Sequence, residues 1–238
     1  MKKARLISVA FVVIASLAAA GTLEVGAGVV PSAASGIIAF HSQRSGDTEI
    51  WVMNPDGSEL TNLTDNDGRT EARPTWSPDG GKLAVFYIEL VQVDGSWVRT
   101  AAGLEVLNLA ADGAGGIEIA STTTILDETE DPDSFSMGAL DWARTGNMLV
   151  FTQRPAGSDE RDLFTIDMDA PSTITNITNT PSLDESEVSW SPDDSEIVFR
   201  LRGYKKESKQ SGLWKIGSDG SGATNLDASS GEQADWLR

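Results

Sequence analysis

The side chains that could carry out catalysis are few in kind, because the chain has one histidine and no cysteine. A hydrolase needs a nucleophile, a base and an orienting acid, and the sequence has no Gly-x-Ser-x-Gly elbow. His41 directly follows a short apolar segment, where a polar residue facing a turn is ordinary. One histidine without cysteine also excludes a His-rich transition-metal site. We therefore predict no catalytic residues.

Carboxylates are plentiful, which makes calcium the more reasonable metal. The run Asp65-Asn66-Asp67-Gly68 alternates oxygen ligands around a glycine turn, although it lacks the spaced bidentate Glu of a full calcium loop. Residues 127–133 hold five carboxylates. The candidate calcium ligands are Asp65, Asp67, Asp127, Glu128, Glu130 and Asp131. The ordinary explanation of both runs is a solvated loop, so calcium is the one cofactor we consider.

Two segments have the composition of contact surfaces. Trp97 follows the run 91–96 on what the pattern predicts to be a long hairpin protruding from the second repeat. Residues 200–209 form a basic hairpin on an acidic chain, suited to an acidic partner, a polyanionic glycan or a neighbouring copy. The candidate binding residues are Trp97, Arg200, Arg202, Tyr204, Lys205, Lys206 and Lys209. A solvated loop is again the alternative explanation.

A repeat organises the elements that must position these residues. Tryptophan returns at intervals of 66, 48 and 46 residues, at Trp76, Trp142, Trp190 and Trp236. The first and third begin Trp-Ser-Pro-Asp-Gly and Trp-Ser-Pro-Asp-Asp, and the second has decayed to Trp-Ala-Arg-Thr-Gly. The last two intervals match a four-stranded blade. Pro and Gly set the turn geometry there, so we interpret the aspartates as structural and the tryptophans as packing between blades.

Each unit has the pattern strand, turn, strand, turn, strand, turn, strand. Apolar segments ending in Phe lie at 36–40, 82–86, 147–151 and 196–199. Segments with alternating apolar positions follow at 49–53, 104–107, 163–166 and 213–216. Asp-Gly turns and a short last strand close most units. A sandwich does not require the same pattern four times, whereas a propeller does. We predict an all-β propeller of four-stranded antiparallel blades.

The two ends of the repeat region complement each other. The region starts with the second strand of a unit, at Gly36, and ends with the first strand, at 234–236. Joining these strands in one blade would close a four-bladed ring and remove edge strands. The alternatives are a fragment of a larger propeller and a half-ring that pairs with another copy. A small ring has a narrow axis, which favours a shallow binding face over a deep pocket.

Trp76-Ser-Pro-Asp-Gly with the following apolar strand, and Ile50-Trp-Val-Met-Asn-Pro-Asp-Gly, resemble the TolB-like or WD40-like (PD40) propeller repeat over residues 36–238. Similar repeats occur in TolB of the Tol–Pal envelope system, in prolyl oligopeptidase-type peptidases and in oligogalacturonate lyases. The resemblance implies the fold. It implies little about the ligand, because the architecture differs: such proteins typically have six blades, whereas four repeats are found here, and TolB has an α/β domain ahead of its blades.

The N-terminus has the pattern of a secretory signal. Basic residues precede an apolar run that ends in three alanines, which predicts a signal peptide at 1–20 and a flexible lead-in at 21–35. Removing the signal takes away three positive charges and moves the formal net charge from −18 to −21. Such acidity repels nucleic acid and anionic lipid, so we expect neither nucleic-acid binding nor stable membrane insertion after cleavage.

These patterns predict a periplasmic or secreted propeller that works as a binding module, not an enzyme. Its partner would be a protein or polysaccharide of the cell envelope or exterior. One alternative is a carbohydrate-active enzyme, either a polysaccharide lyase or a lactonase-like hydrolase, that uses carboxylates and a divalent cation. Another is a structural subunit of a larger ring.

Overall fold

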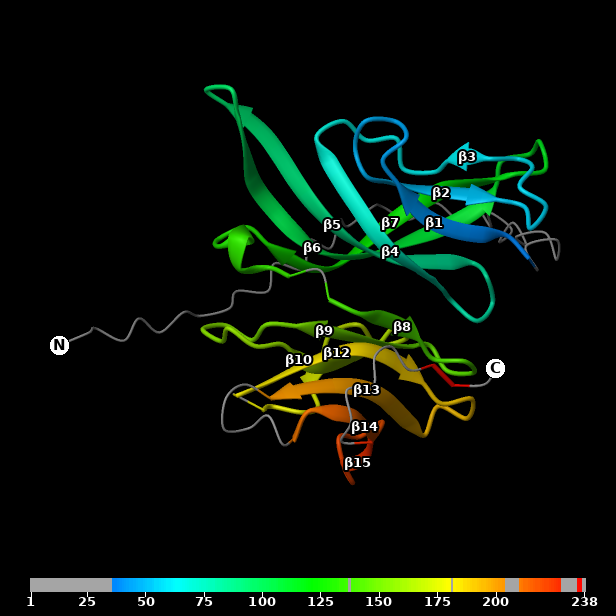
Figure 1. The fold of residues 1–238 in the computed structure, drawn as a ribbon. Helices are drawn as coiled ribbons and strands as arrows, with labels where there is room; N and C mark the ends of the chain where they lie inside the picture. The colour runs from blue at the N-terminus through cyan, green and yellow to red at the C-terminus, as the bar shows by residue number, and fades with distance from the viewer. Residues whose placement is uncertain (1–35, 137, 181, 204–209, 228–234, 237–238) are drawn as a thin grey trace, which may run out of the picture.

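The structure is a computed structural model, and it describes residues 36–136, 138–180, 182–203, 210–227 and 235–236. The predicted signal peptide and lead-in lie outside the described residues. The described chain folds into four small antiparallel sheets arranged as a four-bladed propeller, as predicted (Figure 1). No helix in these ranges is long and apolar enough to cross a membrane.

Each blade is a meander of consecutive strands. Blade 1 contains β1 (Ile38–Ser42), β2 (Glu49–Met53) and β3 (Thr61–Asn62). Blade 2 contains β4 (Arg69–Trp76), β5 (Lys82–Val93), β6 (Ser96–Ala111) and β7 (Ile117–Glu128), followed by the 3-10 turn η2 (Pro132–Ser134). Blade 3 contains β8 (Leu140–Trp142), β9 (Met148–Gln153), β10 (Asp162–Asp167) and β11 (Ile174–Asn176). Blade 4 contains β12 (Leu183–Trp190), β13 (Glu196–Gly203), β14 (Gly212–Gly217) and β15 (Thr224–Asp227).

Blade 2 differs from the others because its outer three strands are long. The β5–β6 hairpin turns tightly at Asp94 and Gly95, which both have positive φ, and Val93 pairs with Ser96. The hairpin projects beyond the other strands (Figure 1). The long hairpin predicted to protrude from the second repeat is therefore confirmed.

Apolar clusters join successive blades. Val85 and Leu107 of blade 2 pack with Ile50 of blade 1. Phe86 of blade 2 packs in one cluster with Trp142 of blade 3, and a third cluster joins blades 3 and 4. The motif tryptophans Trp142 and Trp190 are each 1% exposed. Their predicted role in packing between blades is confirmed, because these clusters connect one blade to the next.

The motif aspartates hold their own turns, as predicted. Asp79 accepts hydrogen bonds from Ser77 Oγ at 2.6 Å and from the Gly81 amide at 3.0 Å. Asp193 does the same in blade 4, accepting from Ser191 Oγ at 2.7 Å and from the Ser195 amide at 3.2 Å. These Asx-type contacts stabilise the turn between the first two strands of a blade.

The turn of blade 3, whose motif has decayed, is stabilised by a residue of the next blade. Ala143 and Thr145 replace the serine and aspartate that cap the turn in blades 2 and 4. Asp194 of blade 4 accepts hydrogen bonds from the amides of Arg144, Thr145 and Gly146 at 2.6, 2.8 and 2.9 Å. It also accepts one from the Thr145 hydroxyl. The turn of blade 3 is thus held by a carboxylate that the sequence places 48 to 50 residues away.

The predicted join of the two chain ends involves residues that are only partly described. Of the C-terminal segment the structure describes Asp235 and Trp236, which are not in a strand. Asp235 accepts a hydrogen bond from Ser189 Oγ of β12 at 2.7 Å, so this segment lies at the inner strand of blade 4. Its pairing with β1 stays a prediction.

Candidate functional site

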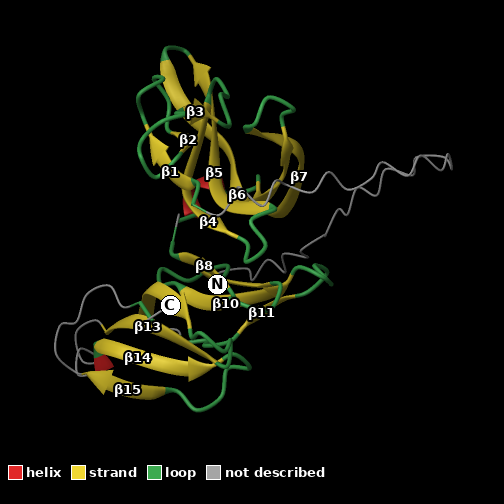
Figure 2. Cartoon of the chain, turned by 90° about the vertical axis from the view of Figure 1, so that its right-hand side faces the viewer, coloured by secondary structure: helices red, strands yellow, loops and turns green. Residues whose placement is uncertain are grey.

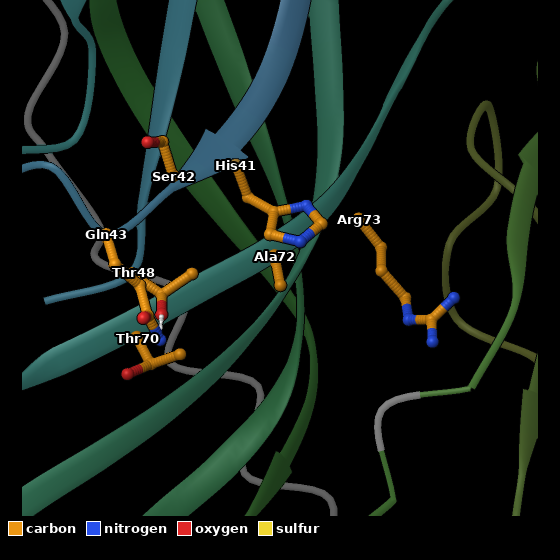
Figure 3. Close-up of a pocket in the computed structure, with 7 residues that line it drawn as sticks. All are labelled: His41, Ser42, Gln43, Thr48, Thr70, Ala72 and Arg73. Carbon is orange, nitrogen blue, oxygen red and sulfur yellow. Dashed lines mark hydrogen bonds between the residues drawn. The ribbon is translucent and has the colours of Figure 1, made fainter.

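The innermost strands of all four blades surround one cavity of about 420 Å³ on the propeller axis. Its lining residues are Ala39, Phe40, His41, Arg73, Pro74, Ala139, Leu140, Glu187, Val188 and Asp235. A second cavity of about 640 Å³ lies beside it between blades 1 and 2, and is lined by His41, Ser42, Gln43, Thr48, Thr70, Ala72 and Arg73 (Figure 3). The two cavities share His41 and Arg73, so we treat them as one axial site.

Two β-bulges direct charged side chains to the axis. Strand β4 shifts register between Ala72 and Thr75, and β12 shifts at the equivalent place between Ser186 and Ser189. Arg73 and Glu187 lie inside these bulges with φ of 59° and 55°. Residues other than glycine seldom adopt positive φ, and bulges that redirect side chains are frequent beside binding and active sites. The shared geometry therefore singles out Arg73 and Glu187.

The charges at the axis are available to a ligand. Arg73 and His41 are exposed and Glu187 is half-buried. Within the described ranges, none of the three side chains makes a hydrogen bond or ion pair. Figure 3 shows the Arg73 side chain extending away from the other lining residues. A ligand group could pair with these side chains without first breaking a contact inside the protein.

The axial site is bipolar. His41 and Arg73 come from blades 1 and 2, whereas Glu187 comes from blade 4 and Asp235 from the C-terminal segment. Arg144 lies 3.6 Å from Asp141 and 3.7 Å from Asp235, so the carboxylate of Asp235 is already partly neutralised. The arrangement suits a ligand that presents both an anionic and a cationic group.

A buried carboxyl network lies next to the bulges and holds neighbouring blades together. Glu71 and Glu185 are both fully buried, five residues before a motif tryptophan. Glu71 accepts a hydrogen bond from Asn66 Nδ2 at 3.1 Å, and Glu185 accepts one from the Thr180 hydroxyl. Burial raises the pKa of Glu71 to about 7 and that of Glu185 to about 8.

The same network reaches back to the preceding blade. Glu49 accepts the amide of Asn66 at 3.0 Å, and Asp162 accepts the amide of Thr180 at 3.0 Å. Each junction therefore brings two carboxyl groups close together, and their repulsion adds to the effect of burial in raising the pKa of the more buried one. We interpret this network as structural, because its members bond to one another and do not line the axial cavities.

Arg69 belongs to this interior as well. Its guanidinium lies 4.2 Å from the centre of the Tyr87 ring and 2.7 Å from Glu105. Tyr87 donates its hydroxyl to Asp127 at 2.8 Å. Burial raises the pKa of Tyr87, and the bond to Asp127 adds to this shift. Asp127, a candidate calcium ligand, is thus the acceptor of a tyrosine.

The other predicted site residues are scattered. Asp65 accepts a hydrogen bond from Asn62, and Glu128 accepts the amides of Glu130 and Asp131. In the described ranges no three Asp, Glu or His side chains gather as metal ligands. Calcium binding stays a prediction. Trp97 is 62% exposed on the β5–β6 hairpin, where a contact residue was expected.

The structure describes only part of the basic segment 200–209. Tyr204, Lys205, Lys206 and Lys209 lie outside the described residues. Arg200 and Arg202, which were expected in a loop, are in strand β13. Their strand pairs with β12. Burial acts to raise the pKa of Asp184, but Arg161 and, less strongly, Arg202 hold that pKa below its ordinary value.

The axial residues were missed at the sequence level. Arg73 and Glu187 each stand three residues before a motif tryptophan, inside the aligned segments 62–76 and 176–190. The signal was a shared offset at which two aligned repeats carry opposite charges. His41 was noted only as a candidate base, and in the structure it lies within β1.

No protein-family model matches the sequence, and no curated protein matches it. Solved structures of the same fold do. TolB from Acinetobacter baumannii has 15% identity and a TM-score of 0.56, covering 83% of this chain and 43% of that one. An oligogalacturonate lyase from Vibrio parahaemolyticus has 16% identity and a TM-score of 0.53, covering 81% of this chain and 49% of that one.

A puromycin-hydrolyzing peptidase from Mycobacterium tuberculosis has 10% identity and a TM-score of 0.57, covering 81% of this chain and 30% of that one. The chain thus spans less than half of each of these three structures. At such identities the likeness shows the fold alone. The chain is a β-propeller of the kind found in TolB, in lyases and in peptidases, and this fold serves both binding proteins and enzymes.

Proposed function

We propose that this chain is an exported binding module that holds a segment of a partner polypeptide at the propeller axis. The observation that carries the proposal is the pair of equivalent bulges that present Arg73 and Glu187, without partners among the described residues, to one axial cavity. We also propose that its blades are copies of the TolB-like repeat and that residues 1–20 direct export.

A polypeptide fits the axial site better than a glycan does. Polypeptides carry both charge signs, as the site does, whereas an acidic polysaccharide meets Glu187, Asp235 and a net charge of −18. Among the described residues that line the cavity, Phe40 is the one Phe, Tyr or Trp and it is half-buried, so the site has little stacking surface for sugar rings. Unpaired charges at such a site give orientation and on-rate to an incoming partner.

The test is a titration with a fluorescein-labelled octapeptide that carries one Glu and one Lys, four residues apart. We expect saturable binding that Arg73→Gln and Glu187→Gln each weaken about tenfold, the loss of one partly desolvated charge pair. The matched control is Arg154→Gln, an exposed arginine that does not line the cavities. Binding that both axial variants leave unchanged would refute the proposal.

The alternative, a carbohydrate-active enzyme, is tested by adding calcium and measuring the melting temperature and turnover. A lyase or lactonase-like enzyme that uses a divalent cation should be stabilised by calcium through mass action. A calcium-dependent rise in melting temperature, together with turnover of uronate oligomers, would replace binding by catalysis as the function of the chain.

A further inference from the structure

The outer edge of blade 2 differs from the other three outer edges. Strand β7 is the last strand of its sheet and has 12 residues, whereas β3, β11 and β15 have 2, 3 and 4. Figure 2 shows β7 on the outer side of its blade. Residues 120–124 in its middle are all exposed. A long exposed edge strand offers unpaired backbone groups to another chain.

The middle of this edge, from Ser121 to Thr124, lacks the residues that commonly protect an exposed edge strand. From Ile119 to Leu126 the sequence Ile-Ala-Ser-Thr-Thr-Thr-Ile-Leu contains no charged residue and no proline. Proteins commonly guard exposed edges with lysine, proline or bulges. Bulges at Ala120 and Ile125 lie near the two ends of this run and limit its unguarded part to the residues between them. Between them, the segment from Ser121 to Thr124 pairs regularly with β6 and has the β-branched composition of a strand that accepts a neighbour.

The hydrogen-bond direction along β6 shows which groups of β7 face outward. The Leu109 amide donates to Gly81 O at 2.9 Å, towards β5. Backbone groups alternate in direction along a strand, so Asn108 and Val106 face β7, where they pair with Ser121 and Thr123. Thr122 and Thr124 therefore direct their N–H and C=O groups to the free edge.

The charges at the two ends of the edge select the occupant. Glu118 stands at one end of the uncharged run, and Asp127 and Glu128 stand at the other. A second copy pairing antiparallel would place acidic residues against acidic residues, which destabilises a strand pair. A segment with basic residues at both ends is complementary in charge.

We propose that β7 binds, by strand addition, an extended polypeptide segment with an uncharged β-branched centre and Lys or Arg at both ends. This site lies on the rim of the propeller and is separate from the axial site. The backbone of Thr122 and Thr124 supplies the hydrogen bonds, and the flanking carboxylates set the charge of the partner.

The first test uses synthetic peptides against the whole chain. A fluorescein-labelled Lys-Thr-Val-Thr-Val-Thr-Val-Lys peptide should bind saturably in fluorescence anisotropy, and more weakly as salt is added. A counterpart with Glu at both ends should bind about tenfold more weakly or not at all. Methylation of alternate peptide amides should abolish binding, because it removes the strand pairing and leaves the charges in place. Equal binding of the Glu-flanked or the N-methylated peptide would overturn the proposal.

The second test changes the protein. Thr122→Pro removes an outward N–H without removing a bond to β6, so it should weaken the Lys-flanked peptide about tenfold or more. Asn225→Pro, at an exposed position of the outer strand β15, is the matched control and should leave binding unchanged. An unchanged affinity in Thr122→Pro, with a wild-type melting temperature, refutes the assignment. A dimer in light scattering that Thr122→Pro dissociates also refutes it and assigns the edge to a second copy.

Discussion

The structure and the repeat pattern predict opposite effects on stability when Asp194 is replaced by glycine. At this position the more regular motif has Gly80, and Asp194 itself has φ of 58°, a conformation that glycine adopts without strain. Restoring a motif residue with the right backbone preference commonly stabilises a protein. The structure indicates the opposite outcome, because Asp194 accepts four hydrogen bonds from the turn of blade 3.

The expected loss follows from these four contacts. A hydrogen bond to a charged acceptor contributes about 1.5–3 kcal/mol when buried. Thr145 is exposed and Asp194 is half-buried, so water can replace part of each contact and we reduce this to about 0.5–1 kcal/mol per bond. The sum is about 2–4 kcal/mol, and relief of the positive φ returns about 1 kcal/mol. We expect Asp194→Gly to lose about 1–3 kcal/mol and Asp194→Ala, which keeps the strain, to lose about 1 kcal/mol more.

Urea unfolding of the whole chain measures this difference. With a slope of about 2–3 kcal/mol per M, the midpoint of Asp194→Gly should fall by about 0.3–1.5 M. Thr145→Val combined with Asp194→Gly gives a double-mutant cycle, and the two changes should be less than additive because they share one bond. A midpoint for Asp194→Gly at or above that of the wild type would refute the conclusion that Asp194 stabilises the turn of blade 3.

Two further predictions concern the buried carboxyls and the protruding hairpin. A carboxyl whose folded pKa exceeds its unfolded value stabilises fully below the unfolded value, and that contribution is lost as the pH rises through the folded pKa. With the pKa raised from 4.5 to about 7 for Glu71 and to about 8 for Glu185, the melting temperature should fall as the pH rises from about 4.5 to 8, and Glu185→Gln should reduce that fall. Trp97→Ser should change the unfolding free energy by less than about 0.5 kcal/mol in urea titration, since Trp97 is 62% exposed; a larger loss would show that the hairpin packs on the body.

The repeat could be predicted because each blade is a local unit. Trp76, Trp142 and Trp190 mark the end of an inner strand, and the Ser-Pro-Asp turns follow from short-range chemistry. The protruding hairpin was predicted from the run 91–96 that precedes Trp97. In each case the residues that determine the structure are neighbours in sequence, so one chain is enough to identify them.

What could not be predicted depends on contacts between blades. Asp194 bonds to the turn of blade 3, some fifty residues earlier, and nothing in the sequence of either segment indicates this partner. Arg200 and Arg202 were placed in a loop because their charge was considered without the strand pairing of β13. The direction of the Arg73 side chain depends on a bulge with positive φ. The residue types give no sign of this bulge, since neither arginine nor the glutamate at the equivalent position, Glu187, favours positive φ.

The aligned segments 62–76 and 176–190 explain how the axial site can carry opposite charges on one scaffold. Both contain Asn, Thr, Glu and Trp at matching positions, and these residues make the blade junction: Thr64 and Thr178 accept amides of Ile50 and Leu163, and the glutamates are buried. The position three before the tryptophan makes no such contact, and it differs, being Arg73 in one blade and Glu187 in the other. The repeated residues thus hold the bulge, while the residue at its tip is free to vary. Exchanging the two side chains should therefore leave the melting temperature nearly unchanged and reverse the charge polarity that the axis presents to a ligand.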